Sequence, residues 1–160
     1  MSEAKKVLVV FYSHSGNTRT IGQAIAEKLG ADVEEIVEAK PKTGLIHFVA
    51  SGFQAKSGGQ AKIQPPHRDP ALYDLVIVGS PVYAGTIASP VRTYLTEQKL
   101  RIKKVACFVT SGAPKNEPAL TAMSQTLGKT PLAMLGTAAA DVKTGAYKDK
   151  VTVFCAQLAR

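Results

Sequence analysis

The 160-residue chain lacks tryptophan, has only two cysteines, and contains no apolar run of the length needed to cross a bilayer. The separation of Cys107 and Cys155 matches no metal-ligand pattern, so we expect both to be buried structural thiols. The amino-terminal MSEAKK leads directly into an apolar run and has none of the features of a secretion signal. These absences predict a cytoplasmic protein with no metal site and no membrane-inserted segment.

Acidic residues are also scarce, since 20 Lys and Arg outnumber 12 Asp and Glu and the net charge is +8. Such an excess favours acidic partners, nucleic acid or anionic surfaces. However, no aromatic residues are interleaved with the basic ones, as a platform for stacked bases would require. The basic groups also precede predicted strands, at the edge of a parallel sheet opposite to the edge where ligands bind. We therefore expect no nucleic-acid partner and interpret these groups as a solvated rim: Lys5 and Lys6, then Lys99, Arg101, Lys103 and Lys104.

What the sequence does contain is a series of apolar runs separated by amphipathic segments. Three of the runs are almost continuously apolar, which is typical of strands buried on both faces of a parallel sheet. A more charged run is predicted to be an edge strand on which Glu34 and Glu35 are solvated. The five expected strands are Val7–Tyr12, Asp32–Glu38, Leu75–Ser80, Val105–Thr110 and Leu132–Asp141.

Segments with apolar residues at helical spacing alternate with these strands. Ser89 and Pro90 predict a helix start, with serine as the N-cap and proline as the first helical residue. The last segment has a helical apolar stripe, although its Val-Thr-Val-Phe core is also compatible with a strand. The expected helices are Thr18–Leu29, Leu45–Lys56, a helix from Ser89, Pro118–Leu127 and a final one near 147–158, with a loop at Ser57–Pro70. This alternation predicts one α/β domain over residues 1–160, with a doubly wound five-stranded parallel sheet between two helical layers.

The loop after the first strand is the most informative segment. Ser13-His14-Ser15-Gly16-Asn17-Thr18 places hydroxyls and backbone N–H groups at a helix N-terminus, where an anion is stabilised. The loop lacks the Gly-Lys-Ser/Thr ending of a nucleoside triphosphate site and the three spaced glycines of a dinucleotide site. It therefore predicts a site for one terminal phosphate, and the alternative is a turn that only caps the helix. His14 has two possible roles: it offers only its backbone N–H, or its imidazole faces the phosphate.

Two further loops follow strands at the edge where doubly wound sheets bind ligands. The loop Gly79–Ile87 is apolar, is stiffened by Pro81 and carries Tyr83, so it offers a stacking face and backbone groups to a flat heteroaromatic ring. The alternative is that Tyr83 is an ordinary loop tyrosine. The other loop, Thr110–Glu117, begins with small polar residues. Together the three loops predict a phosphorylated flat ring as the ligand.

In these loops the chain resembles the flavodoxin family. The phosphate loop matches the family pattern of alternating Ser/Thr followed by Gly-Asn-Thr, and Tyr73-Asp74 leads into the third strand as in the family. Pro81–Gly85 matches the first ring-contacting loop, and Thr110-Ser111-Gly112 is similar to the start of the second. The resemblance covers essentially the whole chain, whose length is that of the short-chain group. It implies the strand order 2-1-3-4-5, non-covalent FMN, and one-electron transfer between redox proteins.

Carried over to this sequence, the resemblance implies three groups of cofactor-binding residues and no catalytic side chain. The first group would hold the FMN phosphate, and the second would flank the isoalloxazine, with Tyr83 stacked on it and a carbonyl near Ala84 or Gly85 meeting the flavin N5–H. The third group would approach the pyrimidine edge through backbone atoms. The groups are Ser13, His14, Ser15, Gly16, Asn17 and Thr18; Pro81, Val82, Tyr83, Ala84 and Gly85; and Ser111, Gly112, Ala113, Lys115 and Asn116.

The chain departs from the family in two respects. Ala113, Pro114 and Lys115 stand where a second stacking aromatic residue is expected, so one ring face is open or is covered by a residue such as Phe53. An open face would admit a flat substrate such as a quinone. The ring loops also hold only one carboxylate, Glu117, which predicts a less negative potential for the final reduction step than is usual in the family. The basic surface predicts redox partners with acidic docking faces.

Three functions are consistent with these features. The leading hypothesis is an FMN-binding electron carrier, a monomer or weak dimer, in which no side chain acts as an acid or a base. The alternative is an FMN-dependent NAD(P)H:quinone-type oxidoreductase. The third is a module of the same fold that binds a protein partner and no FMN.

Overall fold

The computed structural model describes residues 5–39, 61–112 and 116–159. Their core is one sheet with the strand order β2-β1-β3-β5-β6, in which a short strand, β4, pairs only with β3 and is antiparallel to it. The predicted parallel sheet and its order 2-1-3-4-5 are therefore confirmed when the five parallel strands are counted along the chain. The strands are β1 (Val7–Phe11), β2 (Asp32–Glu35), β3 (Leu75–Tyr83), β4 (Thr86–Ile87), β5 (Val105–Ser111) and β6 (Met134–Ala138).

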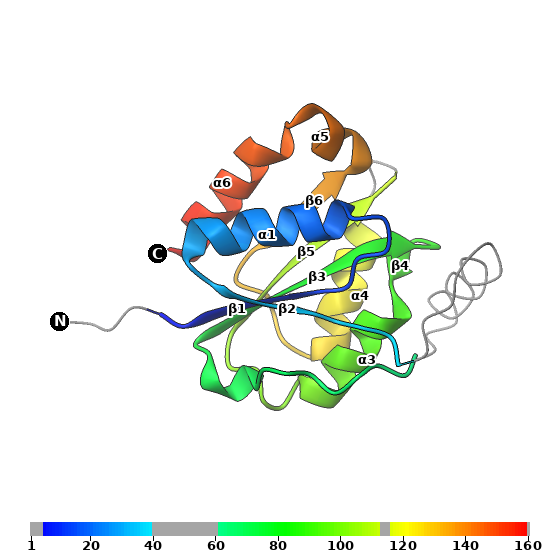
Figure 1. The fold of residues 1–160 in the computed structure, drawn as a ribbon, viewed down its shortest axis with the longest axis vertical. Coiled ribbons are helices and arrows are strands. Elements are labelled where there is room, and N and C mark those ends of the chain that lie inside the picture. Colours follow the sequence, from blue (N-terminus) through cyan, green and yellow to red (C-terminus); the bar gives the residue numbers. More distant parts are fainter. Residues whose placement is uncertain (1–4, 40–60, 113–115, 160) are drawn as a thin grey trace.

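Helices cover both faces of the sheet, in three layers (Figure 1). On one face lie α1 (Asn17–Leu29), α5 (Ala139–Thr144) and α6 (Tyr147–Leu158), and on the other lie α3 (Ser89–Gln98) and α4 (Glu117–Leu127). The last segment is thus a helix rather than a strand, and the predicted helix at Leu45–Lys56 lies outside the described residues.

The two faces have separate apolar cores because successive strand residues point in opposite directions. In β1, Leu8 belongs to the cluster under α3 and α4, whereas Val9 belongs to the cluster under α1 and α6. Both residues are fully buried. The sheet is therefore covered on both sides, as its continuous apolar runs predict.

The segment Gly79–Ile87 differs from its prediction as a loop. Pro81, Val82 and Tyr83 continue β3, and a tight turn then returns the chain as β4. Ala84 and Gly85 have φ values of +50° and +80°, and positive φ at both central residues suits a two-residue hairpin turn.

Three element ends also differ from the predicted ones. β2 ends at Glu35 rather than Glu38, because the chain beyond it pairs with another segment. β6 ends at Ala138 and α5 begins, because the Asp141 carboxylate accepts the backbone N–H of Ala138 at 2.9 Å. Ser89 is the first residue of α3 and not its N-cap.

Residues 61–68 pack along the β2 edge and explain why Glu34 is not solvated as predicted. Its side chain accepts the backbone N–H of Arg68 at 2.7 Å, and the residue is only 6% exposed. Further along, Glu38 forms an antiparallel bridge with Ile63, and the N–H of Gln64 donates to the Val37 carbonyl at 2.8 Å.

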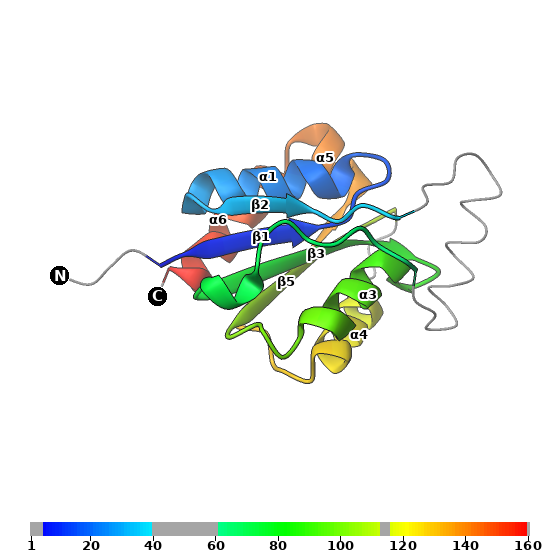
Figure 2. The same cartoon turned by 60° about the horizontal axis from the view of Figure 1, so that its bottom comes forward.

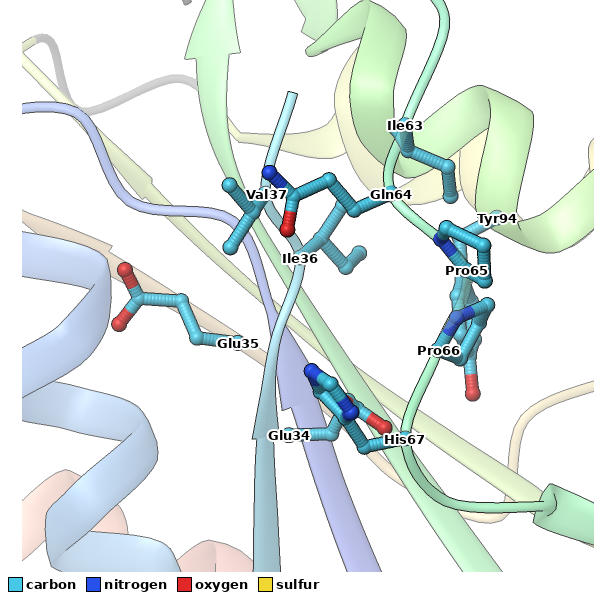
Figure 3. A pocket seen from close by; sticks show the side chains of 10 residues that line it. All are labelled: Glu34, Glu35, Ile36, Val37, Ile63, Gln64, Pro65, Pro66, His67 and Tyr94. Carbon is cyan, nitrogen blue, oxygen red and sulfur yellow. The ribbon is translucent and has the colours of Figure 1, made fainter. Parts of the chain in front are cut away.

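A small cavity lies between this segment and β2 (Figure 3). Its walls are the side chains of residues 34–37, the segment 63–67, and Tyr94 from α3. Its volume is about 20 Å³, which is room for roughly one water molecule. It is therefore too small to be the site of a heteroaromatic cofactor.

The close contact between Gly79 of β3 and Phe108 of β5 yields a prediction about stability. A Cβ atom at Gly79 would lie 2.0 Å from Phe108 Cζ. We expect Gly79→Ala to lower the free energy of unfolding by about 1–3 kcal/mol, because an overpacked core must shift. Denaturant unfolding measures the change, and Gly112→Ala, which has open space around its Cβ, is the matched control. Equal stability of Gly79→Ala and the parent chain would contradict the packing.

Candidate functional site

The three loops predicted to bind a ligand meet at one edge of the sheet. They follow β1, β3 and β5, whose carboxyl ends lie together (Figures 1 and 2). The N–H of Tyr12, at the start of the first loop, donates to the carbonyl of Gly79 in β3 at 3.3 Å. The Thr18 and Thr110 hydroxyls, from the first and third loops, are 2.7 Å apart. This is the edge at which doubly wound sheets bind ligands.

The phosphate loop is shaped by the hydroxyl of Ser13. Its Oγ accepts the backbone N–H groups of Gly16 at 3.1 Å and Arg19 at 3.2 Å. Gly16 is the N-cap of α1 and has a φ of +102°, a conformation that glycine adopts without strain. Because the Ser13 oxygen accepts both bonds, its O–H proton remains available for donation to an anion at the start of α1.

Arg19, which directly follows this loop, is already paired. Arg19 donates from Nε to Glu35 Oε1 at 2.8 Å and from Nη2 to Glu35 Oε2 at 2.7 Å. This hydrogen-bonded carboxylate raises the pKa of Arg19. The prediction that Glu35 is merely solvated is therefore wrong, although both side chains remain partly exposed. His14 is exposed.

Thr18 differs from the rest of the phosphate loop, because its side chain is directed into the protein. It is only 2% exposed, and its hydroxyl hydrogen-bonds to that of Thr110, which is 4% exposed. The bond links the first turn of α1 to β5 directly before the second ring loop. The Thr18 hydroxyl is thus engaged within the protein, while the Thr18 backbone N–H lies in the first turn of α1.

The first ring loop is a hairpin with a strained tip. Ala84 is the one non-glycine residue with a positive φ in the part of the chain that the structure describes. Such conformations cost about 1–3 kcal/mol and persist only when the surroundings enforce them. Ala84 and Gly85 are both exposed, so the peptide groups of the turn are presented at the edge of the sheet.

Two polar side chains hold this hairpin in place. Ser80 Oγ accepts the N–H of Ala88 at 2.9 Å and donates to the Pro81 carbonyl at 2.7 Å, at the base of the hairpin. Arg92 of α3 donates to Thr86 Oγ1 at 3.1 Å, and partial burial lowers the pKa of its guanidinium. The hairpin is therefore anchored to α3 by two contacts that the sequence pattern does not indicate.

Glu38 is a site residue that the sequence analysis missed. The hydroxyl of Tyr12 donates to Glu38 Oε1 at 2.7 Å, and burial, with this bond, raises the pKa of Tyr12. Burial and the nearby Glu38 charge raise the pKa of Tyr83 to about 12. The carboxylate thus acts electrostatically on the predicted stacking residue. No local signal marks it, because the backbone partners Lys62 and Ile63 that hold this stretch are distant in sequence.

The second ring loop is described only at its two ends. Ser111 is buried and Gly112 is exposed, whereas Ala113 and Lys115 lie outside the described residues, as does Phe53. Asn116 is the N-cap of α4, and its side chain packs over the backbone of Gly136 in β6. Its Oδ1 atom is buried and has no hydrogen-bond partner among the described residues. An N–H group of a bound ring is a suitable donor for this acceptor.

The two cysteines have the surroundings that the composition predicts. Cys107 and Cys155 are both buried and not disulfide-bonded, as predicted, and burial raises the pKa of Cys107 to about 12. Within residues 5–39, 61–112 and 116–159, no helix is long and apolar enough to cross a membrane. Over the same ranges, no three His, Cys, Asp or Glu side chains gather as metal ligands.

The strand order, the helical layers and the hydroxyl-lined loop at the start of α1 define a flavodoxin-like flavoprotein fold. A family model for the flavodoxin domain matches residues 52–151, and the chain belongs to the flavodoxin family.

Solved structures are similar over nearly the whole chain. A flavoprotein from Lactobacillus acidophilus, crystallised in complex with FMN, is 26% identical with a TM-score of 0.69, and the match covers 90% of this chain and 99% of that one. Oxidised flavodoxin 2 from Bacillus cereus is 19% identical with a TM-score of 0.61, covering 96% and 97%. Two-electron reduced flavodoxin from Megasphaera elsdenii is 20% identical with a TM-score of 0.57, covering 94% and 98%. At 19% and 20% identity, the matches to the two flavodoxins show similarity of the fold alone.

The position of Glu38 yields a prediction about Tyr83. We expect Glu38→Gln to lower the pKa of Tyr83 from about 12 toward its ordinary value of 10.0, because a neutral amide no longer opposes the tyrosinate charge. Burial is the larger cause and persists, so the pKa remains above 10.0. Carbon NMR of the tyrosine rings during a pH titration measures it. Glu117→Gln, at the exposed start of α4, is the control, and an unchanged pKa in Glu38→Gln would show that the two groups do not interact.

Proposed function

We propose that this protein binds FMN non-covalently and carries single electrons between redox proteins. The observation that carries the proposal is the Ser13 loop at the start of α1, which meets the Tyr83 hairpin at one edge of the sheet. One feature is suited to a phosphate and the other to a flat ring. Family membership supports the proposal, as does the similar Lactobacillus acidophilus flavoprotein, which was crystallised with FMN.

The residues at this edge fit the parts of FMN in turn. The Ser13 hydroxyl and the N–H groups of the loop through Thr18 would hold the phosphate. Tyr83, half-buried on its hairpin, would stack on the isoalloxazine. Ser111 and Gly112 would face the pyrimidine edge, and the unpartnered Asn116 Oδ1 would accept a ring N–H. FMN, when bound, supplies the one-electron chemistry.

The protein's own contribution is binding, orientation and electrostatics. The braced turn at Ala84 and Gly85 holds its peptide groups toward the ring. The negative charge of Glu38 acts on Tyr83, and it would also oppose a further negative charge on a ring stacked there. This effect of Glu38 acts against the less negative reduction potential that is predicted because the ring loops hold only one carboxylate, Glu117. The raised pKa values of Tyr12 and Tyr83 keep both phenols neutral around physiological pH.

The remaining parts of the proposal concern the cellular setting. The chain would act in the cytoplasm as a monomer or weak dimer. Its partners would be redox proteins with acidic docking faces, a match supported by the net charge of +8.

A comparison of FMN with riboflavin tests the phosphate site. We expect riboflavin to bind at least about 100-fold more weakly than FMN, because hydrogen bonds to a charged group contribute about 1.5–3 kcal/mol each. Ser13→Ala is expected to weaken FMN binding about tenfold and to leave riboflavin binding nearly unchanged. Quenching of flavin fluorescence measures both affinities, and Thr152→Ala, on the exposed side of α6, is the control. Equal affinities for the two flavins would refute the phosphate site.

Reduction experiments separate the carrier from the oxidoreductase. We expect the FMN-loaded protein to accumulate a one-electron-reduced form during photochemical reduction. We also expect it to oxidise NADPH in the presence of a quinone only when a separate reductase is added. Rapid NADPH oxidation without that reductase would favour the oxidoreductase instead. A colourless protein that does not bind added FMN would favour a partner-binding module.

A further inference from the structure

The opposite edge of the sheet, at the amino ends of the strands, carries a continuous row of basic and apolar residues. The backbone carbonyl of Lys6 accepts the N–H of Asp74 at 2.8 Å, and that of Lys104 accepts the N–H of Val76 at 2.9 Å. The N–H of Leu132 donates to the Val105 carbonyl at 2.8 Å. Neighbouring parallel strands lie about 4.8 Å apart, so the segments before β1, β3, β5 and β6 lie side by side. Their lysines and Leu132 surround one shallow hollow: Lys5, Lys6, Lys103, Lys104 and Leu132.

Three leucines project from this edge into solvent. Leu100 is 93% exposed, Leu72 is 68% exposed and Leu132 is 56% exposed. They come from the three loops that precede β5, β3 and β6, at the end of the sheet opposite to the ring hairpin (Figures 1 and 2). From the sequence, the basic residues here are expected to form a solvated rim, but solvation does not account for three exposed leucines among them.

The loops that carry these side chains are fixed in place. Arg101, next to Leu100, pairs with Asp69 at 3.0 Å, and Asp69 also accepts the N–H of Ala71 at 3.0 Å at the start of the turn that contains Leu72. The ammonium group of Lys129, three residues before Leu132, donates to the carbonyl of Ile102. The segments that carry the three leucines are therefore tied to one another, or to the start of a strand, by these contacts.

Two carboxylates at this edge, Asp69 and Asp74, are already engaged. Asp69 pairs with Arg101, and Asp74 accepts the backbone N–H of Lys6 at 2.8 Å. The exposed lysines that flank them, Lys5, Lys103 and Lys104, keep the face strongly positive. The face therefore attracts a negatively charged partner.

We propose that this face docks on an anionic bilayer surface, with the lysines over the lipid headgroups and the leucines inserted between them. The combination of lysine charge and protruding leucines is the combination that binds interfaces of anionic lipid. The leucines stand singly on three loops, so a fluid interface accommodates each one without a matching pocket. An acidic protein would need three separate apolar pockets at fixed spacing, and nucleic acid would gain nothing from the leucines.

This docking holds the carboxyl edge, with its ligand loops, away from the bilayer. The two edges are the opposite ends of one sheet, so a protein bound through the basic edge presents Ser13 and Tyr83 to the solution. The proposal is independent of the ligand at that edge, because no residue of the basic edge belongs to it.

Vesicle binding tests the proposal, and the absence of tryptophan provides a clean reporter. Leu100→Trp introduces the one indole of the chain, at a leucine that is 93% exposed. We expect binding to vesicles of phosphatidylcholine mixed with phosphatidylglycerol, with a blue shift of the tryptophan emission, and no binding to phosphatidylcholine alone. Binding is expected to weaken as salt is added. No binding to the mixed vesicles, or binding with no blue shift, would overturn the proposal.

Matched variants separate a bilayer from an acidic protein. The double variant Lys103→Gln/Lys104→Gln is expected to weaken vesicle binding about 25-fold, because each lost lysine weakens it about fivefold. Lys143→Gln with Lys148→Gln, two exposed lysines on α5 and α6, should leave it unchanged. Leu100→Ser is expected to weaken binding about tenfold, because the apolar insertion is lost. If Leu100→Ser binds as the parent chain does and polyglutamate competes fully with the vesicles, the partner is an acidic polymer and the proposal is wrong.

Discussion

Burial of β1, β3 and β5 on both faces is the constraint on which the rest of the structure depends. Their side chains form two apolar cores, one against α1 and α6 and the other against α3 and α4. Neither face of the sheet can then carry polar chemistry, because an unpaired polar group in such a core is costly. Binding is left to the two edges, where the strands end and their loops reach solvent. The two edges differ in composition: one carries hydroxyls and exposed peptide groups, and the other carries lysines and leucines.

At the carboxyl edge, the polar groups that shape the loops satisfy one another before any ligand arrives. Ser13 binds two backbone N–H groups, Thr18 and Thr110 share one hydrogen bond, and Ser80 closes the base of the hairpin. Such bonds fix the backbone around the site, so a ligand does not have to order it. The same arrangement explains why Ala84 can hold a positive φ, since the braced strands on both sides determine the turn.

The sequence was sufficient for the parts of the fold that depend on local pattern. Continuous apolar runs predict the inner strands, and the family resemblance supplies their order, both confirmed by the pairing of β1 with β2 and β3. The parts that it missed depend on contacts between distant segments. Glu34 is predicted to be solvated, but the backbone N–H of Arg68, distant in sequence, binds its carboxylate. Glu38 is positioned by backbone bonds of its stretch to residues 62–64. Likewise, the bond between Thr18 and Thr110 joins two loops that the sequence predicts separately, and a hairpin replaces the loop because two successive residues adopt positive φ.

The net charge of +8 does not act equally at the two edges. At the carboxyl edge, Arg19 is neutralised by Glu35, and Glu38 adds a negative charge beside Tyr83. At the amino edge, Asp69 and Asp74 are engaged, and exposed lysines such as Lys103 and Lys104 remain. The whole charge raises the rate at which an acidic partner meets the protein, but the local charges decide which edge that partner touches. A redox partner that docks at the ligand edge therefore needs specific short-range contacts, whereas the amino edge attracts any extended negative surface. This division lets one small domain carry two contacts that do not compete, since each uses a different end of the same buried sheet.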